Sequence, residues 1–278
     1  MALRDPASYP PQEPLSEIGT QYHQRVLELG AGIDGQSFAY GDDPYQEVAV
    51  FSAPKPSGVV LAFLHGGGWT NGYKEWMAFM APSLNASGIT FVSIGYRLAP
   101  QVVWPTGVRD GAAGLRWIHD NIAGFGGDSA RIVVGGHSAG GHYATWLAVR
   151  DDWQASLGLP HEIVKGAAPV SGVYDFTVGN GMPGRPQFLA DDMANELDAS
   201  PLHTIKRTPP IFMSWGASDF PHLVAQAKKM KRMYLKNLGR VDTLVLADCD
   251  HFEASYACGD LQAQWVPKVL AWILANEI

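Results

Sequence analysis

Short apolar runs alternate along this chain with longer stretches in which apolar residues recur at helical spacing. The runs are rich in β-branched and aromatic residues and are bounded by glycine, proline, serine or aspartate, a pattern typical of buried strands. The predicted strands are Glu47–Ala53, Val59–Leu64, Ile89–Tyr96, a run from Arg131 to Gly135, Val164–Val170, Ile211–Trp215 and Thr243–Ala247.

The stretches between these runs predict helices. In Val108–Ile122, for example, apolar residues three or four positions apart fall on one side of a helix. The other predicted helices are Glu75–Ala86, interrupted at Pro82, a helix that begins at Ala139, Leu223–Leu235 and Leu261–Asn276. Because strands and helices alternate without internal repeats, the chain predicts an α/β fold with a mostly parallel central sheet flanked by helices, in a single domain over residues 1–278.

Two segments fall outside this alternation. Residues 1–45 begin with a proline-rich stretch, after which Ser16 can cap a helix that runs to about Leu29. We expect this N-terminal arm to lie near the mouth of a pocket. Residues 176–208 are irregular and carry several glycines and prolines. Since this second segment is too short for a separate domain, it is predicted to form a lid or a pocket wall.

The corner between the strand at Arg131 and the helix at Ala139 carries the most specific pattern. It contains Gly136-His137-Ser138-Ala139-Gly140, the Gly-x-Ser-x-Gly pattern of a nucleophile elbow. A serine lifted clear of a sheet on a one-residue turn needs small neighbours two residues before and after it, because strand and helix crowd together there. The alternative is a glycine-rich turn whose serine only caps the helix.

A glycine triplet follows the second predicted strand, in the sequence His65-Gly66-Gly67-Gly68-Trp69. Bare backbone N–H groups in such a loop can stabilise the oxyanion of a tetrahedral intermediate. We therefore predict that the N–H of Gly67 or Gly68, together with that of Ala139, forms an oxyanion hole. His65 is expected to hold this loop by hydrogen bonding rather than to act as a base, and a plain flexible loop is the alternative.

Three polar residues follow predicted strands in the order Ser138, Asp219 and His251. Ligands of such sheets bind beyond the carboxyl ends of the strands, where these side chains can meet, and the order is that of α/β-hydrolases. In the predicted roles, Ser138 attacks a carbonyl, His251 moves the proton and Asp219 orients the imidazole. Asp248 and Asp250 are rival carboxylates, and Asp250 is expected to cap the loop beside the histidine.

These motifs, with Tyr96-Arg97-Leu98-Ala99-Pro100 and the Gly141-His142 that follows the elbow, resemble the α/β-hydrolase esterases of the hormone-sensitive-lipase branch. Ser171-Gly172-Val173-Tyr174-Asp175 and Asp250-His251-Phe252 are similar, more specifically, to the kynurenine formamidase (arylformamidase) subgroup. The resemblance covers the chain from about Val48 to the C-terminus. It implies an α/β-hydrolase fold, the triad given above and cofactor-free hydrolysis of N-formylkynurenine or a similar acyl substrate. A carboxylesterase for short-chain or aryl esters shares every motif and is the alternative.

Several aromatic residues near the ends of these motifs are candidates for the walls of a substrate pocket. They are Trp69, Trp104, Tyr143, Tyr174 and Phe252, with His142 in the elbow helix as a further lining or packing residue. Arg185 is a candidate for binding a substrate carboxylate, whereas an ion pair is favoured for Arg97. His137 is expected to point away from the site. Since no long acyl-binding insertion is visible, we expect a small acyl substrate.

Composition and charge argue against several partners. The net charge of -7 and the pI of about 5.7 do not favour nucleic acid. No apolar run approaches the ~20 residues that span a bilayer, and residues 1–20 lack an apolar signal core. Two cysteines, Cys249 and Cys258, cannot build a disulfide framework. We expect a cytoplasmic protein without membrane contact, and a homodimer is one expected arrangement.

Other classes of function lack their motifs. His161-Glu162 does not continue to His-Glu-x-x-His and no cysteine–histidine cluster has zinc spacing, so no metal is predicted. The glycines match neither the dinucleotide nor the P-loop pattern, so no nucleotide cofactor is expected. A non-catalytic receptor on a hydrolase fold is a further alternative, although it would have no chemical need for Ser138, Asp219 and His251 together. Acyl transfer instead of hydrolysis also stays open.

Overall fold

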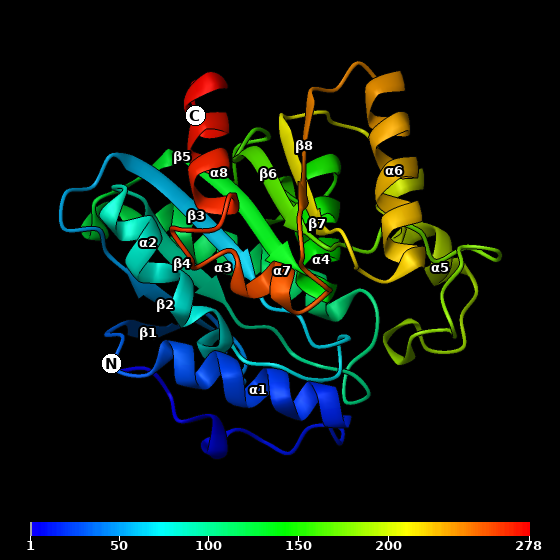
Figure 1. The fold of residues 1–278 in the computed structure, drawn as a ribbon, viewed down its shortest axis with the longest axis horizontal. Coiled ribbons are helices and arrows are strands. Elements are labelled where there is room, and N and C mark those ends of the chain that lie inside the picture. The colour runs from blue at the N-terminus through cyan, green and yellow to red at the C-terminus, as the bar shows by residue number, and fades with distance from the viewer. Residues whose placement is uncertain (1) are drawn as a thin grey trace.

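The computed structural model describes residues 2–278, and its centre is one eight-stranded sheet (Figure 1). The spatial order of the strands is β1-β2-β4-β3-β5-β6-β7-β8. The pairs β1–β2 and β2–β4 are antiparallel, and every pair from β4 to β8 is parallel. The predicted mostly parallel sheet is therefore confirmed. The strands are β1 (Gln36–Ala39), β2 (Glu47–Phe51), β3 (Gly58–Leu64), β4 (Thr90–Ile94), β5 (Gly127–His137), β6 (Val164–Val170), β7 (Ile211–Gly216) and β8 (Val241–Leu246).

Helices cover both faces of this sheet (Figure 1). Short 3-10 helices complete the connections, and the one at Lys74–Met80 lies close to the candidate site. No helix within residues 2–278 combines the length and the apolar character needed to cross a bilayer. The α-helices are α1 (Glu17–Gly30), α2 (Ala81–Ala86), α3 (Thr106–Asn121), α4 (Ala139–Val149), α5 (Ala194–Ala199), α6 (Pro221–Lys236), α7 (Glu253–Tyr256) and α8 (Trp265–Ala275).

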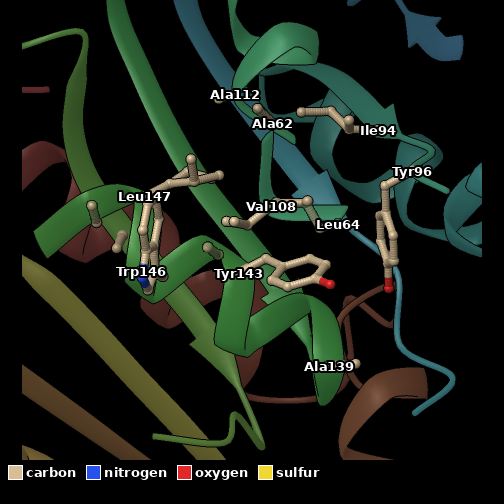
Figure 2. Close-up of a cluster of buried hydrophobic side chains, with 14 of the residues drawn as sticks. Ala62, Leu64, Ile94, Tyr96, Val108, Ala112, Ala139, Tyr143, Trp146 and Leu147 are labelled. Carbon is tan, nitrogen blue, oxygen red and sulfur yellow. The ribbon is translucent and has the colours of Figure 1, made fainter. Parts of the chain in front are cut away.

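The central strands are buried on both faces, which explains their continuous apolar sequences. In β3, Ala62 and Leu64 belong to a core that includes residues of α3 and α4, and Figure 2 shows part of this cluster. Leu61 and Phe63 alternate with them and belong to the core on the opposite face, to which α8 contributes. The sheet is thus packed between two apolar layers. Its strands are therefore fixed in position, and so are the starting points of the loops that follow them.

Four elements show how the sequence pattern and the structure compare at the boundaries. The cap predicted at Ser16 is confirmed, because its side chain accepts a hydrogen bond from Gly19 N at 3.2 Å at the start of α1. The helix predicted over Glu75–Ala86 is instead a 3-10 helix followed by α2. Pro82 lies in the first turn of α2, where a backbone N–H has no partner within the helix, so its absence in proline costs no hydrogen bond. The pattern does not predict α7 or β1, because each is too short to show a period.

Candidate active site

The chain turns sharply between β5 and α4, and Ser138 occupies the corner. Its backbone angles are φ 54° and ψ -116°, a sparsely populated conformation for a residue with a Cβ. The glycines on either side are required by space: a Cβ on Gly136 would lie 2.3 Å from the carbonyl of Gly140, and one on Gly140 would lie 2.0 Å from Leu64 O. The local structure is therefore a strained strand–turn–helix corner that presents the serine hydroxyl at the carboxyl edge of the sheet.

The structure brings together the three polar residues that follow β5, β7 and β8. His251 Nε2 lies 3.0 Å from Ser138 Oγ, and His251 Nδ1 lies 2.8 Å from Asp219 Oδ1. Both His251 and Asp219 are buried. With its Nδ1 proton directed at the carboxylate, the imidazole presents a basic Nε2 to the serine hydroxyl. This arrangement can activate an oxygen nucleophile and store the proton that it releases.

The rival carboxylates are placed elsewhere by their own loops. Asp250 Oδ1 accepts hydrogen bonds from Phe252 N and Glu253 N, each at 2.8 Å, so it caps the start of α7. Asp248 is exposed and has a positive φ of 58°. Only Asp219, of these three, contacts the imidazole.

Asp219 receives further hydrogen bonds that the sequence does not reveal. The hydroxyl of Ser171, in the loop after β6, donates to Asp219 Oδ2 at 2.5 Å, and Phe220 N donates to Oδ1 at 2.7 Å. Burial opposes ionisation of this carboxyl, but the bonds from His251, Ser171 and Phe220 hold the pKa of Asp219 below its ordinary value. Ser171 is itself buried, so its hydroxyl has little competition from water.

We predict that Ser171→Ala lowers kcat/KM about tenfold, because a hydrogen bond to a charged group contributes roughly 1.5–3 kcal/mol. Loss of that bond also raises the pKa of Asp219, so the acid limb of the pH–rate profile moves to higher pH. The matched control is Ser214→Ala, which removes another buried serine, bonded to Trp265 Nε1, without touching the carboxylate. An unshifted acid limb and a wild-type rate in Ser171→Ala would refute the role of this hydroxyl.

The glycine loop after β3 faces the same site as the serine. Gly67 and Gly68 have φ values of 111° and 63°, in the region that favours glycine. Gly67 is also required by space, because a Cβ there would lie 2.1 Å from Asn71 O. The carbonyl of Gly67 accepts hydrogen bonds from Thr70 N at 3.2 Å and Asn71 N at 2.9 Å, which close the loop into a tight turn. Both glycines line one cavity with Ser138, and Ala139 begins α4 directly after that serine.

His65 lies beneath this loop and is fully buried. Its Nδ1 is 2.7 Å from Gly66 O, and its ring stacks on that of Tyr96 with centroids 4.2 Å apart. The Tyr96 hydroxyl donates to His65 O at 2.7 Å. Burial lowers the pKa of His65 to about 4, so the imidazole is neutral at pH 7 and supports the loop through packing and hydrogen bonds.

The cavity in front of Ser138 has a volume of about 200 Å³. Part of its wall comes from the N-terminal segment, through Leu15, Ser16, Gly19 and Tyr22 at the start of α1. Phe252, a predicted pocket residue, also lines the cavity, with its ring centroid 5.3 Å from that of Tyr22. The remaining lining residues, which the sequence does not identify as such, are Asn71, Trp76 and Phe220.

His137, whose side chain is expected to point away from the site, is also among the residues that line this cavity. Its ring centroid lies 4.8 Å from that of His251, and its Nε2 donates to His251 O at 2.9 Å. Burial, followed by the neighbouring His251, lowers the pKa of His137 to about 3, so this ring is neutral. The His137 side chain, next to Ser138 in the chain, therefore supports the loop that carries His251 through this hydrogen bond.

Five of the predicted aromatic and histidine pocket residues do not line the cavity. All five are buried; they are Trp69, Trp104, His142, Tyr143 and Tyr174. The first four pack against Phe188 of the 176–208 segment through ring contacts, and Tyr174 accepts a backbone hydrogen bond from Leu202 N of that segment. Trp69, for example, stacks on Phe188 with centroids 4.3 Å apart. Its Nε1 donates to His142 Nδ1 at 3.1 Å, and His142 Nε2 donates to Ala199 O at 2.7 Å.

Arg185 is likewise placed outside the cavity. Its Nε donates to Glu196 Oε1 at 2.8 Å, and its NH2 group donates to Asp192 O at 2.8 Å. Arg97 forms the favoured ion pair, with two 2.8 Å contacts to the carboxylate of Asp110. Among the described residues that line the cavity, none belongs to 176–208, so that segment covers the aromatic cluster rather than the candidate site.

Comparison with known proteins agrees with this geometry. A family model described as alpha/beta hydrolase fold matches residues 61–254, and the chain belongs to this family. Esterase LipC of Mycobacterium tuberculosis is 31% identical over 76% of this chain, and the chain covers 58% of that protein's length. Carboxylesterase NlhH of the same species is 42% identical over 45% of this chain and 38% of its own. The chain thus spans only about half the length of these curated relatives.

Solved structures share the fold at low sequence identity. Esterase B from Lactobacillus rhamnosis has a TM-score of 0.77 at 18% identity, covering 93% of this chain and 91% of its own. The hyperthermophilic esterase from the archaeon Pyrobaculum calidifontis has a TM-score of 0.74 at 20% identity, covering 94% and 93%. These similarities establish the α/β-hydrolase architecture.

Proposed function

We propose that this chain is a serine carboxylesterase that cleaves small, uncharged esters through an acyl-enzyme. The observation that carries the proposal is the continuous contact from Asp219 through His251 to Ser138, at the floor of a cavity that two glycines also line. Relatives named as esterases support the same class of reaction.

In the proposed reaction, Ser138 Oγ attacks the ester carbonyl carbon while His251 Nε2 takes the hydroxyl proton. The tetrahedral oxyanion is stabilised by backbone N–H groups of Gly67 or Gly68 and of Ala139. His251 then returns the proton to the departing alkoxide, and the alcohol leaves an acyl-Ser138. A water molecule, deprotonated by the same imidazole, hydrolyses the acyl-enzyme and restores the serine.

The cavity favours a short or flat acyl group without charge. Its volume of about 200 Å³ is below the ~300–1,000 Å³ of pockets for drug-sized ligands. The residues that line it include the aromatic Tyr22, Trp76, Phe220 and Phe252. No lysine or arginine of residues 2–278 lines it, whereas the amino-acid part of N-formylkynurenine carries a carboxylate that a cation would bind. Formamidase activity is therefore the second candidate, favoured by the aromatic residues of the wall and by the sequence motifs that resemble the formamidase subgroup.

A substrate panel tests this proposal. We predict that kcat/KM for p-nitrophenyl acetate and butyrate exceeds that for the octanoate ester at least tenfold, because an acyl chain too long for the cavity of about 200 Å³ keeps the ester carbonyl from Ser138. The value for N-formylkynurenine should be lower still, since no lysine or arginine of residues 2–278 lines the cavity to bind its carboxylate. Ser138→Ala serves as the blank. A formamide value above every ester value would make the chain an arylformamidase, and an octanoate optimum would show that the cavity does not set acyl length.

A further inference from the structure

The amide of Gln12, in the N-terminal segment, holds both main-chain groups of Gly72. Gln12 Oε1 accepts from Gly72 N at 2.9 Å, and its Nε2 donates to Gly72 O at 2.9 Å. The Nε2 group also donates to the Tyr45 hydroxyl at 2.9 Å, which fixes the orientation of the amide. One side chain from outside the hydrolase motifs thus clamps a single residue of another loop.

Gly72 is the returning end of the glycine loop that faces Ser138. With φ at 116°, it packs so closely that a Cβ would lie 2.3 Å from His65 Nδ1 and 2.7 Å from Gly66 O. The residue before it, Asn71, donates from its Nδ2 to Glu13 O at 2.6 Å. Two neighbouring residues of the N-terminal segment therefore secure two neighbouring residues of the loop.

The clamp reaches the oxyanion hole through the planarity of the peptide bond. In a trans peptide the C=O of one residue and the N–H of the next point in opposite directions. The carbonyl of Gly67 is held by Asn71 N at 2.9 Å, so the direction of the Gly68 N–H depends on where Asn71 is held. Gln12 fixes Gly72 and thereby limits the movement of its neighbour Asn71. Since Asn71 holds the carbonyl of Gly67, Gln12 also limits the movement of the Gly68 N–H.

The segment that carries Gln12 is itself anchored in the protein interior. The Tyr9 hydroxyl donates to Glu75 Oε2 at 3.0 Å and accepts from Lys74 Nζ at 2.8 Å. Lys74 is fully buried and also contacts Glu47 at 2.7 Å. A firm anchor allows Gln12 to transmit a fixed position to the loop instead of moving with it.

We propose that Gln12 is a positioning residue for the oxyanion hole, and that the N-terminal segment is thereby part of the catalytic apparatus as well as a wall of the cavity. The inference rests on the proposed function, since it concerns the same glycine loop. Removing an oxyanion donor outright costs ~10²–10³-fold in kcat, and a misdirected donor costs a fraction of that.

Two Gln12 variants test the clamp. Gln12→Ala removes the amide, and Gln12→Met keeps its approximate length while losing all three hydrogen bonds of the amide. For both we expect kcat on p-nitrophenyl butyrate to fall about tenfold with KM within about twofold, because the donor acts on the transition state. The second-order rate of fluorophosphonate labelling, in which Ser138 Oγ displaces fluoride at phosphorus, should fall by the same factor, since the phosphoryl oxygen uses the same donors.

Asp5→Ala is the matched control, because it removes the side-chain cap of the 3-10 helix Pro6–Ser8 in the same segment without touching the glycine loop or the Tyr9 anchor. It is expected to lower the thermal midpoint while kcat and the labelling rate stay within about twofold of wild type. Wild-type kcat and labelling in both Gln12 variants would overturn the proposal, as would an equal kcat loss in Asp5→Ala. If the wild-type protein is labelled but cleaves no ester, the substrate assignment has failed, and the labelling rates still decide the role of Gln12.

Discussion

Replacement of Ser138 by alanine is expected to reduce kcat/KM for p-nitrophenyl butyrate by ~10⁵–10⁶-fold, because no other oxygen nucleophile can enter the same acyl-enzyme route. The hydroxyl is 3.0 Å from His251 Nε2, and its removal leaves the rest of the site in place. We therefore expect a normal far-UV circular dichroism spectrum and a thermal midpoint at or above that of wild type, since strained functional groups commonly cost stability.

The comparison with Ser171→Ala makes this result specific. Both residues are serines near the imidazole with positive φ, yet only Ser138 offers its oxygen to the cavity. A fall in kcat/KM of about tenfold for Ser171→Ala and of at least ~10⁵-fold for Ser138→Ala distinguishes a supporting hydroxyl from the nucleophile. Turnover in purified Ser138→Ala above about one per cent of wild type would contradict the assignment of the nucleophile.

Asp219→Asn is expected to lower kcat by ~10⁴-fold, as the corresponding exchange does in serine proteases. An asparagine amide facing His251 Nδ1 favours the tautomer with the proton on Nε2, which cannot accept the proton of Ser138. The carboxylate also stabilises the imidazolium that forms in the transition state. Steady-state kinetics at saturating ester measures the effect, and KM should change little because Asp219 does not line the cavity.

Asp250→Asn and Asp248→Asn are the controls for this exchange. Asp250 caps α7, and an asparagine can cap in its place, so we expect rates within about threefold of wild type. Asp248 is exposed, so Asp248→Asn is expected to leave the rate unchanged. If either variant were crippled while Asp219→Asn stayed active, the wrong carboxylate would have been assigned to the imidazole.

Local sequence pattern predicts the parts of this fold that repeat a simple rule. Val164–Val170 is a strand with the predicted bounds, because all of its residues except the half-buried Lys165 are buried, and a buried parallel strand is mostly apolar. Ser138, Asp219 and His251 meet because each follows a parallel strand, and parallel strands end at one edge of a sheet. Chain order and element type are sufficient to infer that meeting point.

The residues that line the cavity around Ser138 cannot be predicted from the local sequence pattern. Aromatic residues such as Trp69 and Trp104 lie close to the motifs in sequence, but a ring serves a packed core as well as a pocket wall, and packing against the 176–208 segment takes them. Tyr22 is far from every motif, yet α1 folds over the site and carries it there. Only the tertiary arrangement decides which face a helix covers, so periodicity identifies α1 without identifying its role.

The same reasoning applies to hydrogen-bonded support. Ser171 and Gln12 are separated from their partners Asp219 and Gly72 by long stretches of chain, and neither is part of a recognisable pattern for its role. Such residues can be found from the sequence only when the fold is already known.

Intact-protein mass spectrometry after exposure to a fluorophosphonate, followed by peptide mapping, tests the central claim most directly. If Ser138 is a nucleophile activated by His251 and Asp219, the wild-type protein gains a single phosphonyl adduct on the peptide that contains Ser138, and Ser138→Ala gains none. Labelling of Asp219→Asn should be slower by orders of magnitude. An unlabelled wild-type protein, or an adduct on another residue that persists in Ser138→Ala, would contradict the assignment.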